Sequence, residues 1–210
     1  MDDATFRTHE RLKAFPPAQL IYIIICRLSE SGAGPVVLWL YDKIVRRAKG
    51  YSVPRVSRVA PNLYVGGQHH SRGLAAMRDL GITAVVNMRE ESDDRARGVA
   101  LDDYLWVETT DDTPPTLEEL ETGADFIAEQ ITTGSGVYIH CAAGVGRAPT
   151  MAAAYLIREG ATASQAWDTI RATRPFIRPT PPQVRIIDAF ERRYLRHDGE
   201  AAAEAGRDTP

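Results

Sequence analysis

The sequence predicts an α/β domain with a mostly parallel central sheet flanked by helices, and three observations support this fold class. Short runs rich in β-branched residues, such as ITAVVNM at 82–88, alternate with segments of helical periodicity. Glycines and capping residues separate these segments. The 210 residues, 44% hydrophobic and 25% charged, suffice for one domain with a buried core and some extra sequence. Such alternation implies parallel strands covered by helices.

The first half of the domain is expected to contain three strands and one helix. NLYVGG at 62–67 is a short strand that ends in glycines, and 70–81 is a helix stopped by Gly81. The strand at 82–88 is expected to be buried and is rich in β-branched residues. DYLWVET at 103–109 follows as another strand.

The second half is expected to be mainly helical. Thr116 and Glu119 form a capping box for a helix that runs to about residue 132, and GVYIH at 136–140 is the next strand. Three helices then follow, at 148–159, 163–173 and 181–196. Their start signals include the pair Thr162 and Gln165, and Thr180 followed by Pro181.

The ends of the chain are expected to lie outside the domain, which we place at 51–197. Residues 1–17 and 198–210 are polar and without apolar periodicity, so we expect both to be mobile. Residues 18–50 form an N-terminal helical extension. Its apolar run at 18–28 is too short to span a bilayer, which needs about 20 residues.

The second part of this extension is expected to be an amphipathic basic helix. The apolar positions are Val37, Leu40, Tyr41, Ile44 and Ala48, and the other side carries Asp42, Lys43, Arg46, Arg47 and Lys49. Two interpretations are open. Residues 18–50 seat the protein peripherally on an anionic membrane, or the helix packs on the domain with its charged face in water.

Charge and cysteine content exclude several classes of protein. The formal net charge of -3 gives no basic surface for a nucleic acid. Cys26 and Cys141 show no spacing of a disulfide framework or a metal site, and no signal-peptide cleavage pattern is evident. We therefore expect a cytoplasmic protein without a metal or cofactor.

The segment 139–150, IHCAAGVGRAPT, places Cys141 in a tight turn between a strand and a helix. The turn's backbone N–H groups, from Ala142, Ala143, Gly144, Val145 and Gly146, can point inward and bind phosphate. Its two glycines permit the close backbone approach that this requires. Arg147 can grip two phosphate oxygens at once. This positive field is expected to lower the pKa of the thiol below its usual value of about 8.5, which makes Cys141 a thiolate nucleophile.

His140, Cys141, Gly144 and Arg147 match the HCxxGxxR signature, so residues 55–195 resemble the cysteine-dependent tyrosine and dual-specificity phosphatases. The chain is also similar to mitochondrial-type phosphatidylglycerophosphate phosphatases, in the segments NMREE, PTL, VYIHC and TMAAAYLI. The resemblance implies a dual-specificity-phosphatase-like fold. It also implies a cofactor-free phosphomonoester hydrolase that acts through a cysteinyl-phosphate.

The resemblance assigns roles to other residues around this loop. His140 is expected to support the loop through hydrogen bonds rather than to exchange protons with substrate. The general acid is Asp111 or Asp112, and the family spacing to a following proline favours Asp111. Most members carry Ser or Thr at the position of Ala148. The phosphatases of regenerating liver, whose loop is similar, carry alanine there. We therefore expect slow breakdown of the phosphoenzyme.

The substrate is left open between a phosphoprotein and a phospholipid headgroup such as phosphatidylglycerophosphate. The loop contains no lysine, which argues against multiply phosphorylated inositol lipids. Of the basic group Arg174, Arg178 and Arg185, Arg178 is a weak candidate for substrate binding, because charged-face residues are the commoner explanation. Two alternative functions are a phosphate-binding adaptor with little turnover and a sulfur-transfer enzyme, and the spacing of His140, Cys141 and Arg147 argues against the second.

Overall fold

The computed structural model describes residues 24–25, 28–29 and 32–205, without the side chains of 195–205. Some expectations concern residues outside this description. They are those for residues 1–17, for most of the apolar run at 18–28, for Cys26 and for 206–210. Within the described residues, no helix has the length and apolar character needed to cross a bilayer.

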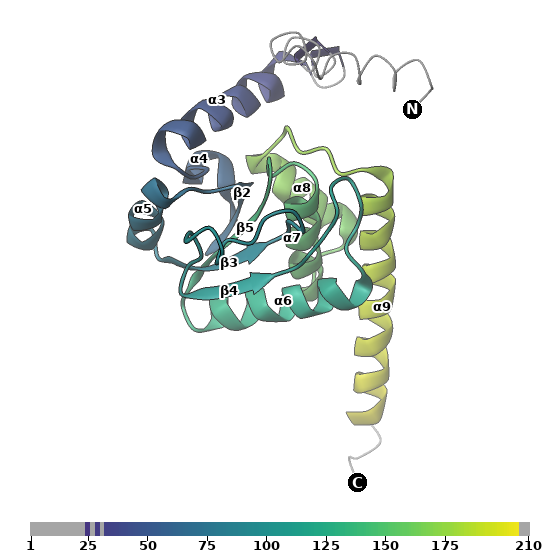
Figure 1. Ribbon diagram of the computed structural model, residues 1–210. Coiled ribbons are helices and arrows are strands. Elements are labelled where there is room, and N and C mark those ends of the chain that lie inside the picture. Colours follow the sequence, from purple (N-terminus) through teal and green to yellow (C-terminus); the bar gives the residue numbers. More distant parts are fainter. Residues whose placement is uncertain (1–23, 26–27, 30–31, 206–210) are drawn as a thin grey trace.

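Figure 1 shows a sheet at the centre of the domain. It has five strands in the order β1-β2-β5-β3-β4. The strands are β1 (Arg58–Ala60), β2 (Leu63–Gly67), β3 (Ile82–Asn87), β4 (Asp103–Trp106) and β5 (Gly136–Cys141). Only β1 is antiparallel to its neighbour, and the other pairs are parallel. The predicted mostly parallel sheet is confirmed, although β1 was not expected because three residues carry no periodicity.

The helices agree with the expected order. They are α3 (Ala33–Lys49), α4 (Pro54–Ser57), η1 (Ser71–Gly73), α5 (Leu74–Asp79), α6 (Leu117–Thr132), α7 (Arg147–Arg158), α8 (Ala163–Thr173) and α9 (Pro181–Ala205). The capping boxes at Thr116 and Thr162 are both formed, with each side chain accepting the backbone N–H three residues on. The helix expected at 70–81 begins as a 3-10 turn before α5, and Gly81 follows with a φ of 76°.

Alternation along the strands divides the core into two layers. Val137 and Ile139 of β5 pack with α6, α7, α8 and α9, whereas Tyr138 faces the smaller cluster on the α5 side. Successive side chains of a strand point to opposite faces, so His140 shares the face of Tyr138, and Cys141 shares that of Ile139. The end of β5 therefore sends the histidine and the thiol to opposite sides of the sheet.

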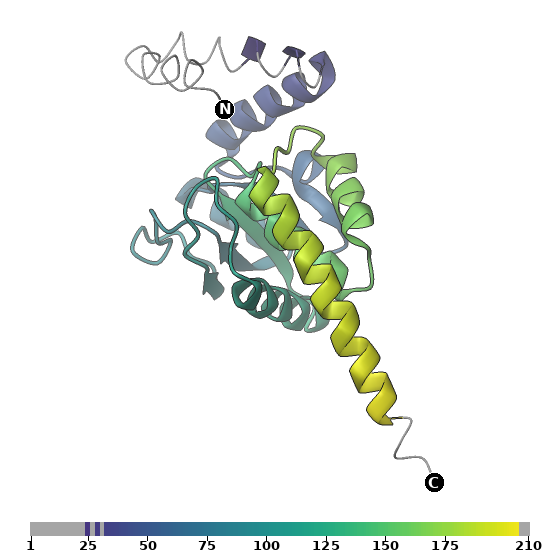
Figure 2. The same ribbon diagram turned by 90° about the vertical axis from the view of Figure 1, so that its right-hand side faces the viewer.

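The last helix is longer than expected. Figure 2 shows α9 crossing the domain and continuing beyond it, and its helical residues reach Ala205 rather than residue 196. Residues 198–205, expected to be part of a mobile tail, are therefore helical. The reason is local, because the sequence GEAAAEA is made mostly of strong helix formers.

The N-terminal helix α3 forms as predicted but turns an unexpected face to the domain. Val36, Trp39 and Asp42 are buried, whereas Val37 and Ile44 are 63% and 67% exposed. Two of the apolar positions that the sequence pattern grouped on one side therefore face water, while the carboxylate of Asp42 is buried along with Val36 and Trp39. Neither sequence interpretation described this orientation, because helical periodicity identifies two faces without saying which one packs.

Candidate active site

The loop at 142–146 connects the end of β5 to the start of α7. Cys141 ends β5 and is 3% exposed, and the backbone N–H of Gly144 donates to its Sγ at 3.2 Å. Gly144 has a φ of 68°, and a Cβ there would lie 2.3 Å from the carbonyl carbon of Gly66. Both the left-handed backbone and the contact with β2 therefore require glycine at this position.

Groups outside the loop hydrogen-bond to its carbonyl oxygens. Arg46 Nη1 donates to the carbonyl oxygen of Ala142 at 3.1 Å, and Arg174 Nη2 donates to that of Gly144 at 3.2 Å. The backbone N–H of Arg178 donates to the carbonyl of Val145 at 2.7 Å. These contacts show that the loop carbonyls point away from the loop interior.

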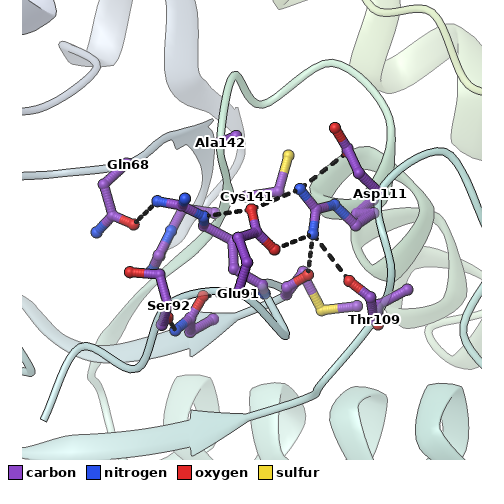
Figure 3. Close-up of polar contacts among 12 residues, drawn as sticks. Gln68, Glu91, Ser92, Thr109, Asp111, Cys141 and Ala142 are labelled. Carbon is purple, nitrogen blue, oxygen red and sulfur yellow. Dashed lines mark hydrogen bonds and ion pairs between the residues drawn. The ribbon is translucent and has the colours of Figure 1, made fainter. Parts of the chain in front are cut away.

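Arg147 is buried at the first position of α7, and acidic and carbonyl oxygens surround its guanidinium (Figure 3). The Glu91 carboxylate accepts from both terminal nitrogens, from Nη1 at 2.9 Å and from Nη2 at 3.2 Å. Nη1 also donates to the carbonyl oxygen of Thr109 at 2.8 Å and to that of Met88 at 3.2 Å. The guanidinium is thus fixed in one orientation beside Cys141.

The Glu91–Arg147 pair stays charged over a wide pH range. Burial acts to raise the pKa of Glu91, but hydrogen bonds from Arg147 and Arg89 outweigh it and lower that pKa to about 2. Burial also acts to lower the pKa of Arg147, whereas its bonds to Glu91 and the nearby charges of Cys141 and Asp111 raise it overall. Glu91 therefore remains an anion at any ordinary assay pH.

The two candidate acids occupy different environments. Asp111 Oδ1 lies 2.9 Å from Arg147 Nη2, and its side chain is 72% exposed. Figure 3 shows its carboxylate directed at this guanidinium. Asp112 has a φ of 60°, and its carbonyl oxygen accepts a hydrogen bond from the hydroxyl of Thr180 at 3.0 Å. The structure thus brings Asp111 to the loop, while Asp112 shapes the backbone of the turn.

The acid-bearing segment is tied to the start of α9. Gln183 is buried, and its Nε2 donates to the carbonyl oxygen of Thr113 at 2.9 Å. Its Oε1 accepts from the backbone N–H of Thr180 at 2.9 Å. Sequence analysis identified Thr180 only as a helix cap and did not identify Gln183, although the Thr-x-x-Gln spacing of a capping box is visible there.

His140 belongs to a buried cluster beneath the loop. Its Nε2 lies 2.7 Å from Asp94 Oδ2, and Gln68 donates to the other oxygen of Asp94 at 2.8 Å. His69 Nε2 lies 3.8 Å from Asp94 and 2.6 Å from the carbonyl oxygen of Val99. The ligand atoms of His69, Asp94 and His140 lie within 4.8 Å of one another, close enough for a metal ion. Because both Nε2 atoms already have hydrogen-bond partners, we interpret the cluster as a support for the loop.

A polar chain that the sequence analysis missed joins this cluster to Arg147. Gln68 Oε1 accepts from Arg89 Nη1 at 2.7 Å, and Arg89 Nε donates to Glu91 at 2.8 Å. Asn87, at the end of β3, shapes the turn by donating to the carbonyl oxygen of Ser92 and accepting from the backbone N–H of Arg89. NMREE carried the family resemblance, but nothing in its spacing assigned a role to Glu91.

The remaining candidates lie around the same loop. Ala148 is completely buried in the second position of α7, so this enclosed position carries no hydroxyl. Arg178 reaches the loop with its backbone N–H, while its side chain is exposed. Arg174, which the sequence analysis placed only in a basic group, is fully buried behind the loop.

The sequence-family model for the dual specificity phosphatase catalytic domain matches residues 63–193, which is more than half of the chain. The chain belongs to this family. The phosphatase domain is 30% identical over 125 residues to the human phosphatidylglycerophosphatase and protein-tyrosine phosphatase 1, covering 55% of this chain and 62% of that protein. It is 28% identical over 153 residues to dual specificity protein phosphatase 1-B of Xenopus laevis, covering 72% of this chain and 40% of the frog protein. The chain thus spans less than two thirds of either relative.

Solved structures agree with this assignment. The crystal structure of PTPMT1 superimposes with a TM-score of 0.62 at 25% identity, and the match covers 69% of this chain and 98% of that one. The structure of PTPMT1 in complex with PI(5)P matches with a TM-score of 0.59, also at 25% identity, over 64% of this chain and 92% of that one. The expected dual-specificity-phosphatase-like fold is therefore confirmed.

The buried histidine gives the domain a predictable loss of stability in acid. Burial, followed by the nearby His140, lowers the pKa of His69 from 6.5 to about 4. Between pH 6.5 and about 4, the imidazole of His69 is therefore protonated in the unfolded chain but neutral in the folded one. The free energy of unfolding should fall there by up to about 1.4 kcal/mol per pH unit from this group. This contribution is complete above pH 6.5 and lost as the pH falls through about 4.

Urea unfolding at a series of pH values measures this slope. His69→Gln, whose amide can still donate to the carbonyl of Val99, should flatten the slope between pH 6.5 and 4. His70→Gln is the control, because it removes the neighbouring imidazole, which is only partly buried. An unchanged slope in His69→Gln would contradict the assignment.

Proposed function

We propose that this protein is a phosphomonoester hydrolase that works through a cysteinyl-phosphate on Cys141. The observation that carries the proposal is the arrangement of three groups around one loop. Gly144 N–H contacts the sulfur, Arg147 is fixed beside it, and the Asp111 carboxylate reaches the same guanidinium. This set supplies a nucleophile, an oxyanion-binding cation and an acid.

In the first chemical step, the Cys141 thiolate attacks phosphorus in line with the ester oxygen. An S–P bond forms, the P–O bond to the leaving group breaks, and Asp111 donates its proton to the departing oxygen. Arg147 and the loop amides hold the remaining phosphoryl oxygens, where negative charge is concentrated. In the second step, water attacks phosphorus, Asp111 accepts the water's proton, and Cys141 leaves as a thiolate with inorganic phosphate as the product.

Asp111 rather than Asp112 is proposed as the acid, and the difference can be measured. Asp111→Asn should lower kcat about a hundred-fold or more, because general acid catalysis contributes 10²–10⁴-fold. The loss should be larger for alkyl phosphates than for 4-nitrophenyl phosphate, whose leaving group needs less protonation. Inhibition by inorganic phosphate should change little. Asp112→Asn is the matched control and should keep the rate, since the contact at Asp112 is through its carbonyl oxygen. The opposite pattern would move the role to Asp112.

Rapid mixing with 4-nitrophenyl phosphate tests the intermediate. We expect a burst of nitrophenol followed by a slower steady state, because Ala148 lacks the hydroxyl that assists departure of the thiolate. Cys141→Ser should abolish both phases, and Ala148→Ser should raise the steady-state rate relative to the burst. Turnover that survives in Cys141→Ser would overturn the proposal. Oxyanion binding without any turnover would instead indicate the phosphate-binding adaptor.

For the substrate, we propose a phospholipid headgroup presented at a membrane. Relatives that carry the names phosphatidylglycerophosphatase and PTPMT1, including one structure in complex with PI(5)P, support this substrate class. The outward face of α3 adds a physical reason. Val37 and Ile44 are exposed one above the other, and Lys43, Arg47 and Lys49 flank them. Apolar side chains bordered by cations suit the surface of an anionic bilayer.

Vesicle flotation tests this attachment with the full chain. We expect binding to vesicles that contain phosphatidylglycerol, weaker binding to phosphatidylcholine alone, and release at high salt. Val37→Glu combined with Ile44→Glu should abolish flotation. Leu80→Glu is the control, since Leu80 is an exposed apolar residue outside α3.

A side-by-side activity assay completes the test of the substrate class. The full chain is given phosphatidylglycerophosphate in vesicles, a phosphotyrosine peptide and a phosphothreonine peptide. The proposal requires the highest kcat/KM for the vesicle substrate. Faster hydrolysis of either peptide, with no flotation, would assign a phosphoprotein substrate instead.

A further inference from the structure

Helix α3 buries charged groups that point toward the phosphate loop. Asp42 is 2% exposed and Arg46 is half-buried, although both belong to the charged side of the helix. Burying a charge is unfavourable unless it is paired or hydrogen-bonded. Each of these two residues finds its partners at or directly behind the loop at 142–146.

Arg46 reaches the loop at its first residue. Its Nη1 donates to the carbonyl oxygen of Ala142 at 3.1 Å and lies 3.4 Å from that of Gln68. The guanidinium is packed over the end of β2, where a Cβ on Gly67 would lie 2.5 Å from it. The absence of a side chain at Gly67 therefore makes room for this arginine of α3 against the loop.

Asp42 acts on the loop through a second arginine. Its Oδ2 lies 3.5 Å from Nη2 of Arg174, which is fully buried. Arg174 in turn donates from Nε and Nη2 to the carbonyl oxygen of Gly144, at 3.3 and 3.2 Å, and from Nη1 to that of Val56. Asp42 is thus the carboxylate that balances the cation behind the middle of the loop.

The direction of a carbonyl fixes the direction of the next amide. In a planar trans peptide, the C=O of one residue and the N–H of the next point in opposite directions. The carbonyl of Ala142, held outward by Arg46 and by the backbone N–H of Gln68, therefore turns the N–H of Ala143 inward. In the same way, the bond from Arg174 to Gly144 turns the N–H of Val145 inward. These are amides that bind the phosphoryl oxygens in the proposed function.

We propose that Arg46 and Asp42 of α3 are positioning residues for the oxyanion site. Arg46 acts directly on the Ala142–Ala143 peptide, and Asp42 acts through Arg174 on the Gly144–Val145 peptide. Helix α3 is thereby part of the catalytic unit as well as the outer surface of the protein. This inference rests on the proposed role of the loop in binding a phosphoryl group.

Binding of tungstate, measured by calorimetry, tests the inference independently of turnover. Arg46→Met should weaken tungstate binding about ten-fold, the effect of losing one hydrogen bond from a charged donor. It should lower kcat/KM for 4-nitrophenyl phosphate by a similar factor. Arg46→Lys should recover part of both losses, because an ammonium can still donate to the carbonyl of Ala142. Asp42→Asn, which leaves Arg174 in place without its counter-charge, should weaken tungstate binding in the same direction.

Arg58→Met is the matched control, because it removes an equal charge from an exposed residue of β1 and should leave tungstate binding unchanged. Thermal unfolding of each variant identifies any general loss of structure, and binding is measured well below the lowest melting temperature. Wild-type tungstate affinity in Arg46→Met would overturn the inference, as would an equal loss in Arg58→Met. Failure of the proposed hydrolase looks different: the wild type binds tungstate but hydrolyses no phosphate ester.

Discussion

The active site depends on where the carbonyl oxygens of a short loop find their hydrogen bonds. A loop that turns its amides toward an anion must turn its carbonyls the other way, and buried carbonyls need donors. Here the donors include Arg46 of α3, the backbone N–H of Gln68, Arg174 after α8 and the backbone N–H of Arg178. Residues more than a hundred positions apart in the sequence therefore hold the same loop.

The parallel sheet explains why the two sides of the site differ. Because β5 alternates between faces, Cys141 enters the large core with α7, and His140 enters the polar cluster with Asp94. One face thus supplies the packing that fixes the start of α7 and, with it, Arg147. The other face supplies a network that continues through Gln68 and Arg89 to Glu91. The packing on one face and the hydrogen-bond network on the other therefore both position the guanidinium of Arg147.

Local sequence signals predicted most of the fold. The strands other than β1, the capping boxes at Thr116 and Thr162, and the Cys141 loop are each encoded within about ten residues, so they could be predicted without a structure. The partners of the loop could not be predicted in this way. Glu91, Asp94 and Gln183 contact the site through the tertiary arrangement of separate segments, and no periodicity marks them. The orientation of α3 was missed because its two faces are distinguishable by pattern, whereas the face that packs is decided by specific pairs such as Asp42 with Arg174.

The close packing of Gly144 on the backbone of Gly66 has a consequence for recognition. Because the loop packs on the neighbouring strand at Gly144, it has little room to change its width at this point. In the proposed function, its amides contact the phosphoryl oxygens and not the alcohol of the ester. Residues around the loop that contact the organic part of the substrate must therefore distinguish one ester from another.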